Sequence, residues 1–205
     1  KGTNKLTAEE QSEGFTQLFN GTDLTGWVGG PQGYLVRDGL LIIDPLQGGG
    51  GNLLTEKEYG DFVFRFEFRL SPGANNGVGI RAPLTGNPAY DGMEIQILDD
   101  VSPRYRGWLK DYQHHGSIYG VVPAKTGCLK PWGLWNYEEI TAKGKQITVK
   151  VNGTTIVDAD IEKASTPKTI DGGEHPGLKR ASGHIGFCGH GDYLELRNIR
   201  VKSLD

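Results

Sequence analysis

The sequence contains little cysteine and almost no methionine. There are two cysteines and one methionine in 205 residues. Neither Cys128 nor Cys188 has a second cysteine or a histidine at the spacing of zinc ligands, and neither lies in a recognisable nucleophile motif. The two could form a disulfide in an oxidising compartment, or both could be buried free thiols that pack as small apolar residues. We therefore expect no metal ion and no cofactor, and the pairing of the cysteines stays open.

Long apolar runs and a strong charge of one sign are also absent. No segment approaches the ~20 apolar residues that cross a bilayer, so we expect no transmembrane segment in this chain. The 25 acidic and 22 basic residues give a formal net charge of -3, which supplies no broad positive field for a phosphate backbone. We expect no nucleic-acid partner. Because the chain begins with Lys1 rather than methionine, we also expect a preceding signal peptide, lipoprotein anchor or tag.

Helical periodicity is nearly absent, and apolar residues alternate with polar ones instead. From Phe62 to Leu70 every second residue is apolar, whereas Arg65 and Glu67 lie between them. This period of two is typical of a strand with one buried face. The 32 glycines and 10 prolines are spread between such runs and show no repeat, which indicates many turns rather than a fibrous or disordered chain.

Turn residues position the predicted strands. Asp38-Gly39 and Asn152-Gly153 tolerate the positive φ of a tight hairpin turn. Many short strands without crossover helices predict two packed antiparallel sheets, an all-β jelly-roll sandwich. We expect a single domain over residues 1–205. The predicted strands cover residues 34–37, 40–43, 61–70, 77–81, 93–98, 135–142, 146–151, 154–157, 183–188 and 193–201.

One helix start is present near the N-terminus. Thr7 can cap the first amides of a helix, and Glu10, three residues later, can return the bond to the Thr7 backbone. We therefore expect residues 1–14 to form an N-terminal extension with one short helix.

The segment from Asp91 to Asp100 has the pattern of a strand with one polar face. Glu94 and Gln96 lie on one side of it, between long loops that favour binding groups. A β-bulge near Leu98 would turn Asp99 to the same side. Glu94 and Asp99 would then be paired carboxylates, which acid-base or nucleophilic work on a glycosidic bond requires. The alternative is an ordinary solvated strand face.

Three further polar residues are candidates for substrate contacts. Arg81 ends a predicted strand that could neighbour the strand of Glu94, and it would supply a cation for a sugar oxygen or an enolate, or else form a surface salt bridge. His115 and Tyr119 lie in one long loop and offer a base near neutral pH beside a phenol. A loop histidine can equally be plain polar surface.

Histidine and tryptophan in the remaining loops complete the candidates. His190 lies between two glycines in a tight turn. Its side chain either points into the cleft, or histidine occurs here only because it can adopt the backbone conformation of the turn. Trp132, like Trp108 and Trp135, offers an aromatic plane for the C–H face of a sugar ring. Core packing is the alternative for each of these tryptophans.

Several motifs together resemble the 3-keto-disaccharide hydrolase domain family, and they span nearly the whole chain. The opening LFNG followed by GW and the closing HG followed by RNI are the most specific in combination. The matching segments are residues 6–10 (LTAEE), 14–27 (GFTQLFNGTDLTGW), 94–100 (EIQILDD), 116–119 (GSIY), 135–136 (WN), 151–153 (VNG), 183–191 (GHIGFCGHG) and 197–200 (RNIR).

The resemblance implies a concanavalin A-like lectin/glucanase fold, a periplasmic, secreted or cell-surface location, and action on sugars that are oxidised at C3. Such a reaction needs a base for the C2 hydrogen, an acid for the leaving oxygen and donors for the enolate. Glu94 then becomes the leading base or acid, with Asp99 or His190 as its complement. Donors and sugar contacts would come from Arg81, Gln96, His115, Tyr119 and Trp132.

Retaining glucanases of the same fold carry the strand pattern Glu-x-Asp-x-x-Glu, which is similar to Glu94, Gln96 and Asp99 here. Glutamine in the middle and a shorter acid at the end argue against a double displacement. The favoured function is cleavage of a 3-keto-glycoside in a cleft of the concave sheet face. The alternatives are a non-catalytic carbohydrate-binding module and a cell-surface interaction domain, because one fold hosts many functions.

Overall fold

The structure, a computed structural model, describes residues 4–30, 32–48 and 50–205. Lys1 and the two residues after it, part of the expected N-terminal extension, lie outside these ranges.

The alternating segment around Phe66 forms a central strand, β6 (Phe62–Leu70). Its even-numbered residues are buried and its odd-numbered residues are half-buried, as the period of two predicts. Ten short strands were expected from such patterns, and the two-sheet antiparallel sandwich that they predicted is confirmed.

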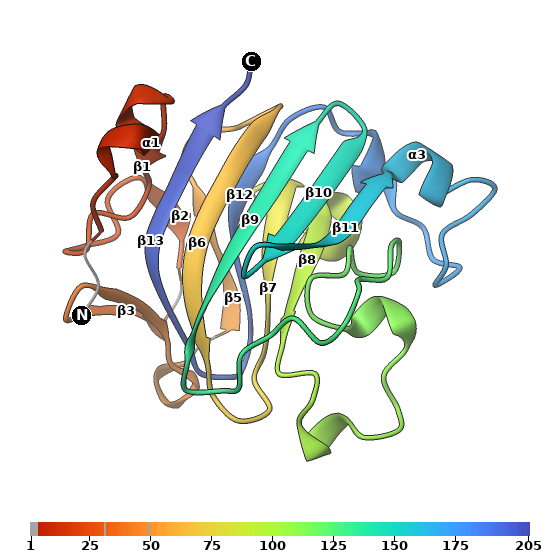
Figure 1. The fold of residues 1–205 in the computed structure, drawn as a ribbon, viewed down its shortest axis with the longest axis horizontal. Coiled ribbons are helices and arrows are strands. Elements are labelled where there is room, and N and C mark those ends of the chain that lie inside the picture. Colours follow the sequence, from red (N-terminus) through yellow and green to blue (C-terminus); the bar gives the residue numbers. More distant parts are fainter. Residues whose placement is uncertain (1–3, 31, 49) are drawn as a thin grey trace.

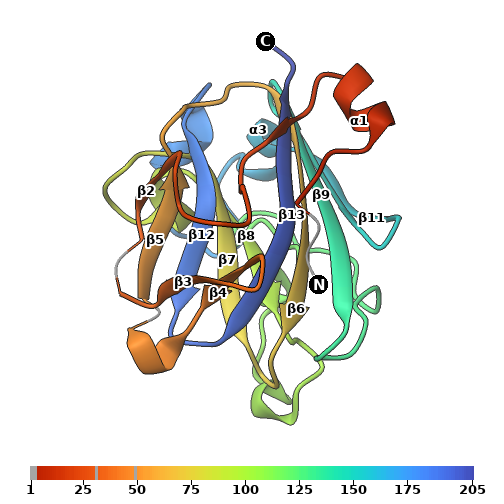
Figure 2. The same cartoon turned by 90° about the vertical axis from the view of Figure 1, so that its left-hand side faces the viewer.

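Two sheets form the two layers of the molecule (Figures 1 and 2). Within the described residues, sheet A has eight strands in the order β11-β10-β9-β6-β13-β4-β3, with β1 paired to β13, and sheet B has five in the order β2-β5-β12-β7-β8. The remaining strand bounds are β1 (Thr16–Gln17), β2 (Trp27–Gly29), β3 (Tyr34–Arg37), β4 (Leu40–Ile43), β5 (Gly50–Thr55), β7 (Asn75–Ala82), β8 (Met93–Leu98), β9 (Trp135–Lys143), β10 (Gln146–Val151), β11 (Thr154–Asp160), β12 (His184–His190) and β13 (Leu194–Ser203).

The two predicted hairpins form as expected. Strands β3 and β4 pair across Asp38-Gly39, and β10 and β11 pair across Asn152-Gly153. Asp38 and Asn152 have φ values of 52° and 49°, the left-handed conformation that Asp, Asn and Gly tolerate best.

An aromatic core joins the sheets. Phe187 of sheet B packs against Phe66 of sheet A with ring centroids 5.7 Å apart, and Phe64 and Trp27 lie within 6.3 Å and 6.0 Å of the same ring. These side chains are buried. Large rings that fill the space between two stacked sheets contribute most of the apolar area that stabilises a sandwich.

The predicted N-terminal helix is present as α1 (Ala8–Ser12), and its capping box is complete. Glu10 N donates to the Thr7 hydroxyl, and Thr7 N donates to the Glu10 carboxylate. The same carboxylate accepts from Arg200 at 2.8 Å and from Arg65 at 3.3 Å. Because both arginines extend from the outer face of sheet A, these bonds hold the extension against that face.

The structure also contains short helices in the long loops, which were not predicted from the sequence. They are α2 (Pro88–Asp91), α3 (Ile161–Ala164) and the 3-10 turns η1 (Pro45–Gln47), η2 (Pro103–Tyr105), η3 (Asp111–Gln113) and η4 (Pro176–Lys179). Asn87 caps α2 and Asp160 caps α3 through their side chains. At three or four residues each they are too short for a helical period to show in the sequence.

Cys128 and Cys188 are free thiols.

Candidate functional site

The outer face of sheet B, which faces away from sheet A, carries Glu94 and Gln96 side by side on β8. Their neighbours Ile95 and Ile97 are fully buried in the core. The predicted division of this strand into an apolar and a polar face is therefore correct. Glu94 and Gln96 are each only 5% exposed, because loops cover the outer face.

Strand β8 lies at the edge of sheet B, and residues 116–119 close that edge. Gln96 N donates to Ser117 O at 3.0 Å, Gly116 N donates to Gln96 O at 2.8 Å, and Tyr119 N donates to Glu94 O at 2.9 Å. These backbone bonds place the Tyr119 side chain next to the strand that carries Glu94.

A glycine makes room for the Glu94 carboxylate. Gly77 on β7 pairs with Gln96, and Gly79 pairs with Glu94. A Cβ atom on Gly77 would lie 2.1 Å from Glu94 Oε1, closer than two such atoms approach in any folded protein. The carboxylate therefore occupies the volume that a side chain at position 77 would fill.

Glu94 is hydrogen-bonded to His190, the last residue of β12. The distance from His190 Nε2 to Glu94 Oε1 is 2.8 Å. The His190 side chain is 41% exposed and the Glu94 side chain 6%, so the imidazole is the accessible member of the pair. The hydrogen bond to Glu94 is the largest cause that raises the pKa of His190, and burial opposes it. Two of the three predicted catalytic residues thus meet.

Three tyrosines lie near one another and near Glu94. Tyr112 and Tyr119 pack edge to face with centroids 5.8 Å apart, and Gln113 Nε2 donates to the Tyr119 hydroxyl at 3.3 Å. Tyr90 on α2 has a raised pKa, mainly because it is partly buried and also because negative charge, including that of Glu94, acts on it. Its phenol therefore stays protonated at neutral pH and serves as a donor.

Tyr90 is held in place by a buried histidine. The His175 ring lies 4.9 Å from the Tyr90 ring, and its Nδ1 is 3.1 Å from Ala89 O. Its Nε2 is 2.9 Å from Asp171 Oδ2. Burial opposes ionisation of Asp171, but hydrogen bonds from Gly173 N, His175 and Thr169 lower its pKa overall. None of these residues was predicted from the sequence.

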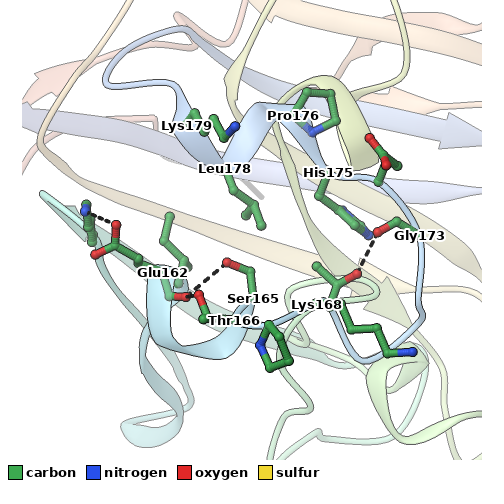
Figure 3. Close-up of a pocket in the computed structure, with 14 residues that line it drawn as sticks. Glu162, Ser165, Thr166, Lys168, Gly173, His175, Pro176, Leu178 and Lys179 are labelled. Atoms are coloured by element: carbon green, nitrogen blue, oxygen red, sulfur yellow. Dashed lines mark hydrogen bonds and ion pairs between the residues drawn. The ribbon is translucent and has the colours of Figure 1, made fainter.

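A large hollow lies on the far side of His175. It has a volume of about 680 Å³ and extends between α3 and η4. Figure 3 shows Glu162 and Thr166 on one wall and Leu178 and Lys179 on the opposite wall, with His175 on a third side. Neither Glu94 nor His190 lines it. His175 links this hollow to the tyrosines, because it lines the hollow and its ring packs against Tyr90.

Arg81 does not face Glu94, contrary to the prediction. The pairing of β7 with β12 shifts by one residue between Gly79 and Ala82, and Arg81 has a φ of 46°. This β-bulge turns the side chain away from the outer face. Its guanidinium donates to Gly60 O, Gly144 O and Asp61 Oδ1 at 2.7–3.1 Å. Arg81 therefore joins the two sheets at one end.

His115 is also not a sugar contact in this structure, since it lies in the core. Its ring stacks on Phe68 with centroids 5.1 Å apart. Leu98 N donates to its Nδ1 at 3.2 Å, so the other nitrogen, Nε2, donates to Glu138 Oε2 at 2.8 Å. Glu138 is fully buried, and its Oε1 has no partner within the described residues.

Asp99 and Trp132 lie together, but not beside Glu94. The pairing of β7 with β8 runs without a shift to Leu98, so the predicted bulge is absent and Asp99 does not turn to the outer face. Gly73 N donates to its Oδ2 at 2.8 Å. Asp99 comes five positions after Glu94, a distance of about 16 Å along an extended chain. Both Asp99 and Trp132 line a separate hollow beyond the end of the strand.

Metal-ligand clusters and membrane-spanning helices are the two remaining features that bear on the kind of site. Within residues 4–30, 32–48 and 50–205, no group of three or more His, Cys, Asp or Glu side chains is placed to hold a metal ion. In the same part of the chain no helix has the length and hydropathy needed to span a membrane.

The chain is similar to known proteins over almost its whole length. A 3-keto-disaccharide hydrolase of Bacteroides thetaiotaomicron is 25% identical over 231 residues, which cover 95% of this chain and 80% of that protein. Two crystal structures from Parabacteroides distasonis, described as putative glycosyl hydrolases, superpose with TM-scores of 0.83 and 0.79 at 27% and 30% identity. They cover 98% and 93% of this chain, and the chain covers 99% of each.

A more distant relative shows the same fold. A Bacillus subtilis protein with a galectin-like fold superposes with a TM-score of 0.61 at 13% identity, over 92% of this chain and 94% of that one. The predicted jelly-roll architecture is thus confirmed. Residues 14–202 match the family of 3-keto-alpha-glucoside-1,2-lyase-like domains. The chain belongs to this family.

Proposed function

We propose that this protein is an enzyme that cleaves the glycosidic bond of 3-keto-glycosides, including 3-keto-disaccharides. The observation that carries the proposal is the 2.8 Å contact between the buried carboxylate of Glu94 and the half-exposed imidazole of His190. A buried acid whose partner is open to solvent is suited to moving protons for a bound ligand. The names of the relatives supply the class of substrate.

The chemistry begins with the ketone at C3, which acidifies the hydrogen on C2. A base removes that proton, and the electrons of the C–H bond form an enolate between C2 and C3. The enolate collapses to a double bond between C1 and C2, and the bond from C1 to the leaving oxygen breaks. An acid protonates this oxygen as it leaves. Water then adds across the new double bond in a hydrolase, whereas a lyase releases the unsaturated sugar.

In this proposal Glu94 is the base and protonated His190 is the acid. Glu94 Oε1 accepts from His190 Nε2, which leaves Oε2 for the C2 proton. The other ring nitrogen of His190, Nδ1, has no hydrogen-bond partner within the described residues, and its N–H would protonate the leaving oxygen. The raised pKa of His190, which comes mainly from the Glu94 hydrogen bond, keeps the acid charged to a higher pH.

Phenols and an amide complete the proposed site. Tyr90 stays protonated because burial raises its pKa, so its hydroxyl, with that of Tyr119, would donate to the enolate oxygen. Gln96, two residues from Glu94 on the same face, would contact a sugar hydroxyl. Donors that point to the developing charge are commonly worth ~3–4 kcal/mol each in the transition state.

The geometry argues against ordinary double displacement. Retaining glycosidases place two carboxyl groups about 5–5.5 Å apart. The second acid of the glucanase-like pattern, Asp99, lies about 16 Å along the strand from Glu94 and is held by Gly73 N. An elimination at a 3-keto sugar needs only one carboxylate next to an acid, which Glu94 and His190 provide.

The test compares a glycoside with its 3-keto derivative under identical conditions, with aglycone release as the readout. We expect release from the ketone alone. The Glu94→Gln variant should release nothing while its thermal unfolding matches that of the unchanged protein. Cleavage of the plain glycoside would show that the ketone is not required. Full activity of the Glu94→Gln variant would show that Glu94 is not the base.

The same experiment addresses the alternative of a non-catalytic carbohydrate-binding module. A module would bind both glycosides and release aglycone from neither. A periplasmic or cell-surface location belongs to the same proposal, and fractionation of cells that carry the full-length protein tests it.

A further inference from the structure

A second hollow lies at the end of the sandwich where β8 ends. It is formed by residues 99–103, residues 129–132 and Pro72, and its volume is about 280 Å³. We call it the Trp132 hollow. The Trp132 side chain is 56% exposed, and its indole N–H has no hydrogen-bond partner within the described part of the chain. A volume near 300 Å³ is the lower limit of small-molecule sites, which suits a single ring.

The walls of the Trp132 hollow are held in place by backbone contacts. On one wall, Ser102 N donates to Asp99 O at 3.1 Å, and Asp99 N donates to Ala74 O at 3.0 Å, next to the start of β7. On the other wall, Lys130 N donates to Asn136 Oδ1 at 2.8 Å, and Gly133 N donates to Leu70 O at 2.9 Å. Both walls are thus tied to the sheets, so a ligand would find the hollow already formed.

A buried carboxylate lies in the Trp132 hollow. Asp99 is only 3% exposed. Its Oδ2 accepts from Gly73 N, and its Oδ1 has no partner among residues 4–30, 32–48 and 50–205. Unlike Glu138 Oε1, Asp99 Oδ1 is not fully enclosed, so it can be reached from the hollow and can accept a hydrogen bond there. A hydroxyl of a ligand would supply the missing donor.

The combination of an open aromatic face and an unpaired acceptor selects the class of ligand. The C–H face of a sugar ring packs on an indole while its hydroxyls donate to a carboxylate. Asp99 and Lys130 are the charged side chains among the described lining residues, and because their charges offset each other the lining favours neither an anion nor a cation. A purely apolar ligand would leave Asp99 Oδ1 without a partner. A neutral sugar ring satisfies both groups.

We propose that the Trp132 hollow is a second carbohydrate-binding site, which holds a neutral sugar ring of a glycan apart from the Glu94–His190 pair. Trp132 stacks on the ring, and Asp99 accepts from one of its hydroxyls. The site does not depend on the proposed cleavage, because the strand distance of about 16 Å between Asp99 and Glu94 keeps the two regions separate.

Native gel electrophoresis in the presence of unmodified neutral polysaccharides tests this site. Dextran, soluble starch, a β-glucan and hydroxyethyl cellulose serve as the probes, and they lack the 3-keto group that the proposed cleavage requires. We expect at least one of them to retard the protein. Trp132→Ala should need a polysaccharide concentration at least about tenfold higher for the same retardation, because the aromatic ring that stacks on the sugar is lost.

Matched variants distinguish the Trp132 hollow from the rest of the protein surface. Trp108 is 54% exposed but does not line the hollow, so Trp108→Ala should be retarded like the unchanged protein. Asp99→Asn keeps an acceptor for Gly73 N and should still weaken binding, because an amide replaces the second carboxylate oxygen. Glu94→Gln, which disables the proposed cleavage, should be retarded normally.

Three outcomes would overturn the second site. They are no retardation by any polysaccharide, equal retardation of the Trp132→Ala and unchanged proteins, and loss of retardation in Glu94→Gln instead. Sedimentation velocity adds a further check: self-association that Trp132→Ala abolishes would identify the hollow as an interface between copies of the chain. Failure of the cleavage assay alone leaves the second site standing.

Discussion

Replacement of Gly77 by alanine should disrupt the Glu94–His190 hydrogen bond although neither of these two residues is substituted. The new Cβ would lie 2.1 Å from Glu94 Oε1, whereas Cβ atoms essentially never approach a neighbour within 3.0 Å. The carboxylate must therefore move by about 1 Å, which lengthens a 2.8 Å hydrogen bond beyond the range in which such bonds persist.

The size of the effect follows from the bond that is lost. A hydrogen bond to a charged group contributes about 1.5–3 kcal/mol, so kcat/KM on a 3-keto-glycoside should fall by roughly 10- to 100-fold. Overpacking of a buried site costs about 1–3 kcal/mol of unfolding free energy. The pKa of His190 should fall toward its ordinary value, because the Glu94 hydrogen bond is the main cause that raises it.

Three measurements on Gly77→Ala check the reasoning: steady-state kinetics, urea unfolding and NMR titration of the His190 ring. Gly79→Ala is the control, since Gly79 also lies on the outer face of β7 but its Cβ would first meet Pro88 Cβ at 3.2 Å. The control should keep most of its activity. An unchanged His190 titration in Gly77→Ala would refute the claim that glycine at this position makes room for the carboxylate.

Three more predictions follow from the contacts. The cleavage rate should fall as pH rises through the raised pKa of His190, because the acid must be protonated, and Glu94→Asp should move this alkaline limb to lower pH. His115→Ala should lower the unfolding free energy in urea by about 3–5 kcal/mol, since it leaves the buried Glu138 without a donor, and Glu138→Leu added to it should restore part of the loss. Arg81→Lys should lower the melting temperature, through a loss of about 1–3 kcal/mol, with kcat/KM unchanged.

The strands and the polar face of β8 could be predicted from the sequence because both depend on local patterns. Alternation from Phe62 to Leu70 reports burial directly, and Asp38-Gly39 reports a turn. Strands β1, β2 and β5 were missed since they are short or rich in glycine. Such segments show neither the alternation of apolar and polar residues nor the β-branched and aromatic residues that indicate a strand.

The direction of a site side chain was predictable where the parity of a strand decides it. Glu94 and Gln96 are of this kind. Arg81 was misplaced because a bulge, which depends on pairing with β12, reversed the parity. His115 and Tyr90 lie in long loops whose course is set by tertiary contacts, so no pattern in the sequence distinguishes the buried histidine from a surface one.

The backbone bonds that join residues 116–119 to β8 have a consequence for solubility. An uncovered edge strand is a template for pairing with other chains, and here the covering segment also delivers the Tyr119 phenol. Detachment of this one segment would expose the edge and at the same time remove a side chain from the proposed catalytic site. Under mild denaturant or heat, inactivation and the first aggregates should therefore appear together, well before the sandwich itself unfolds.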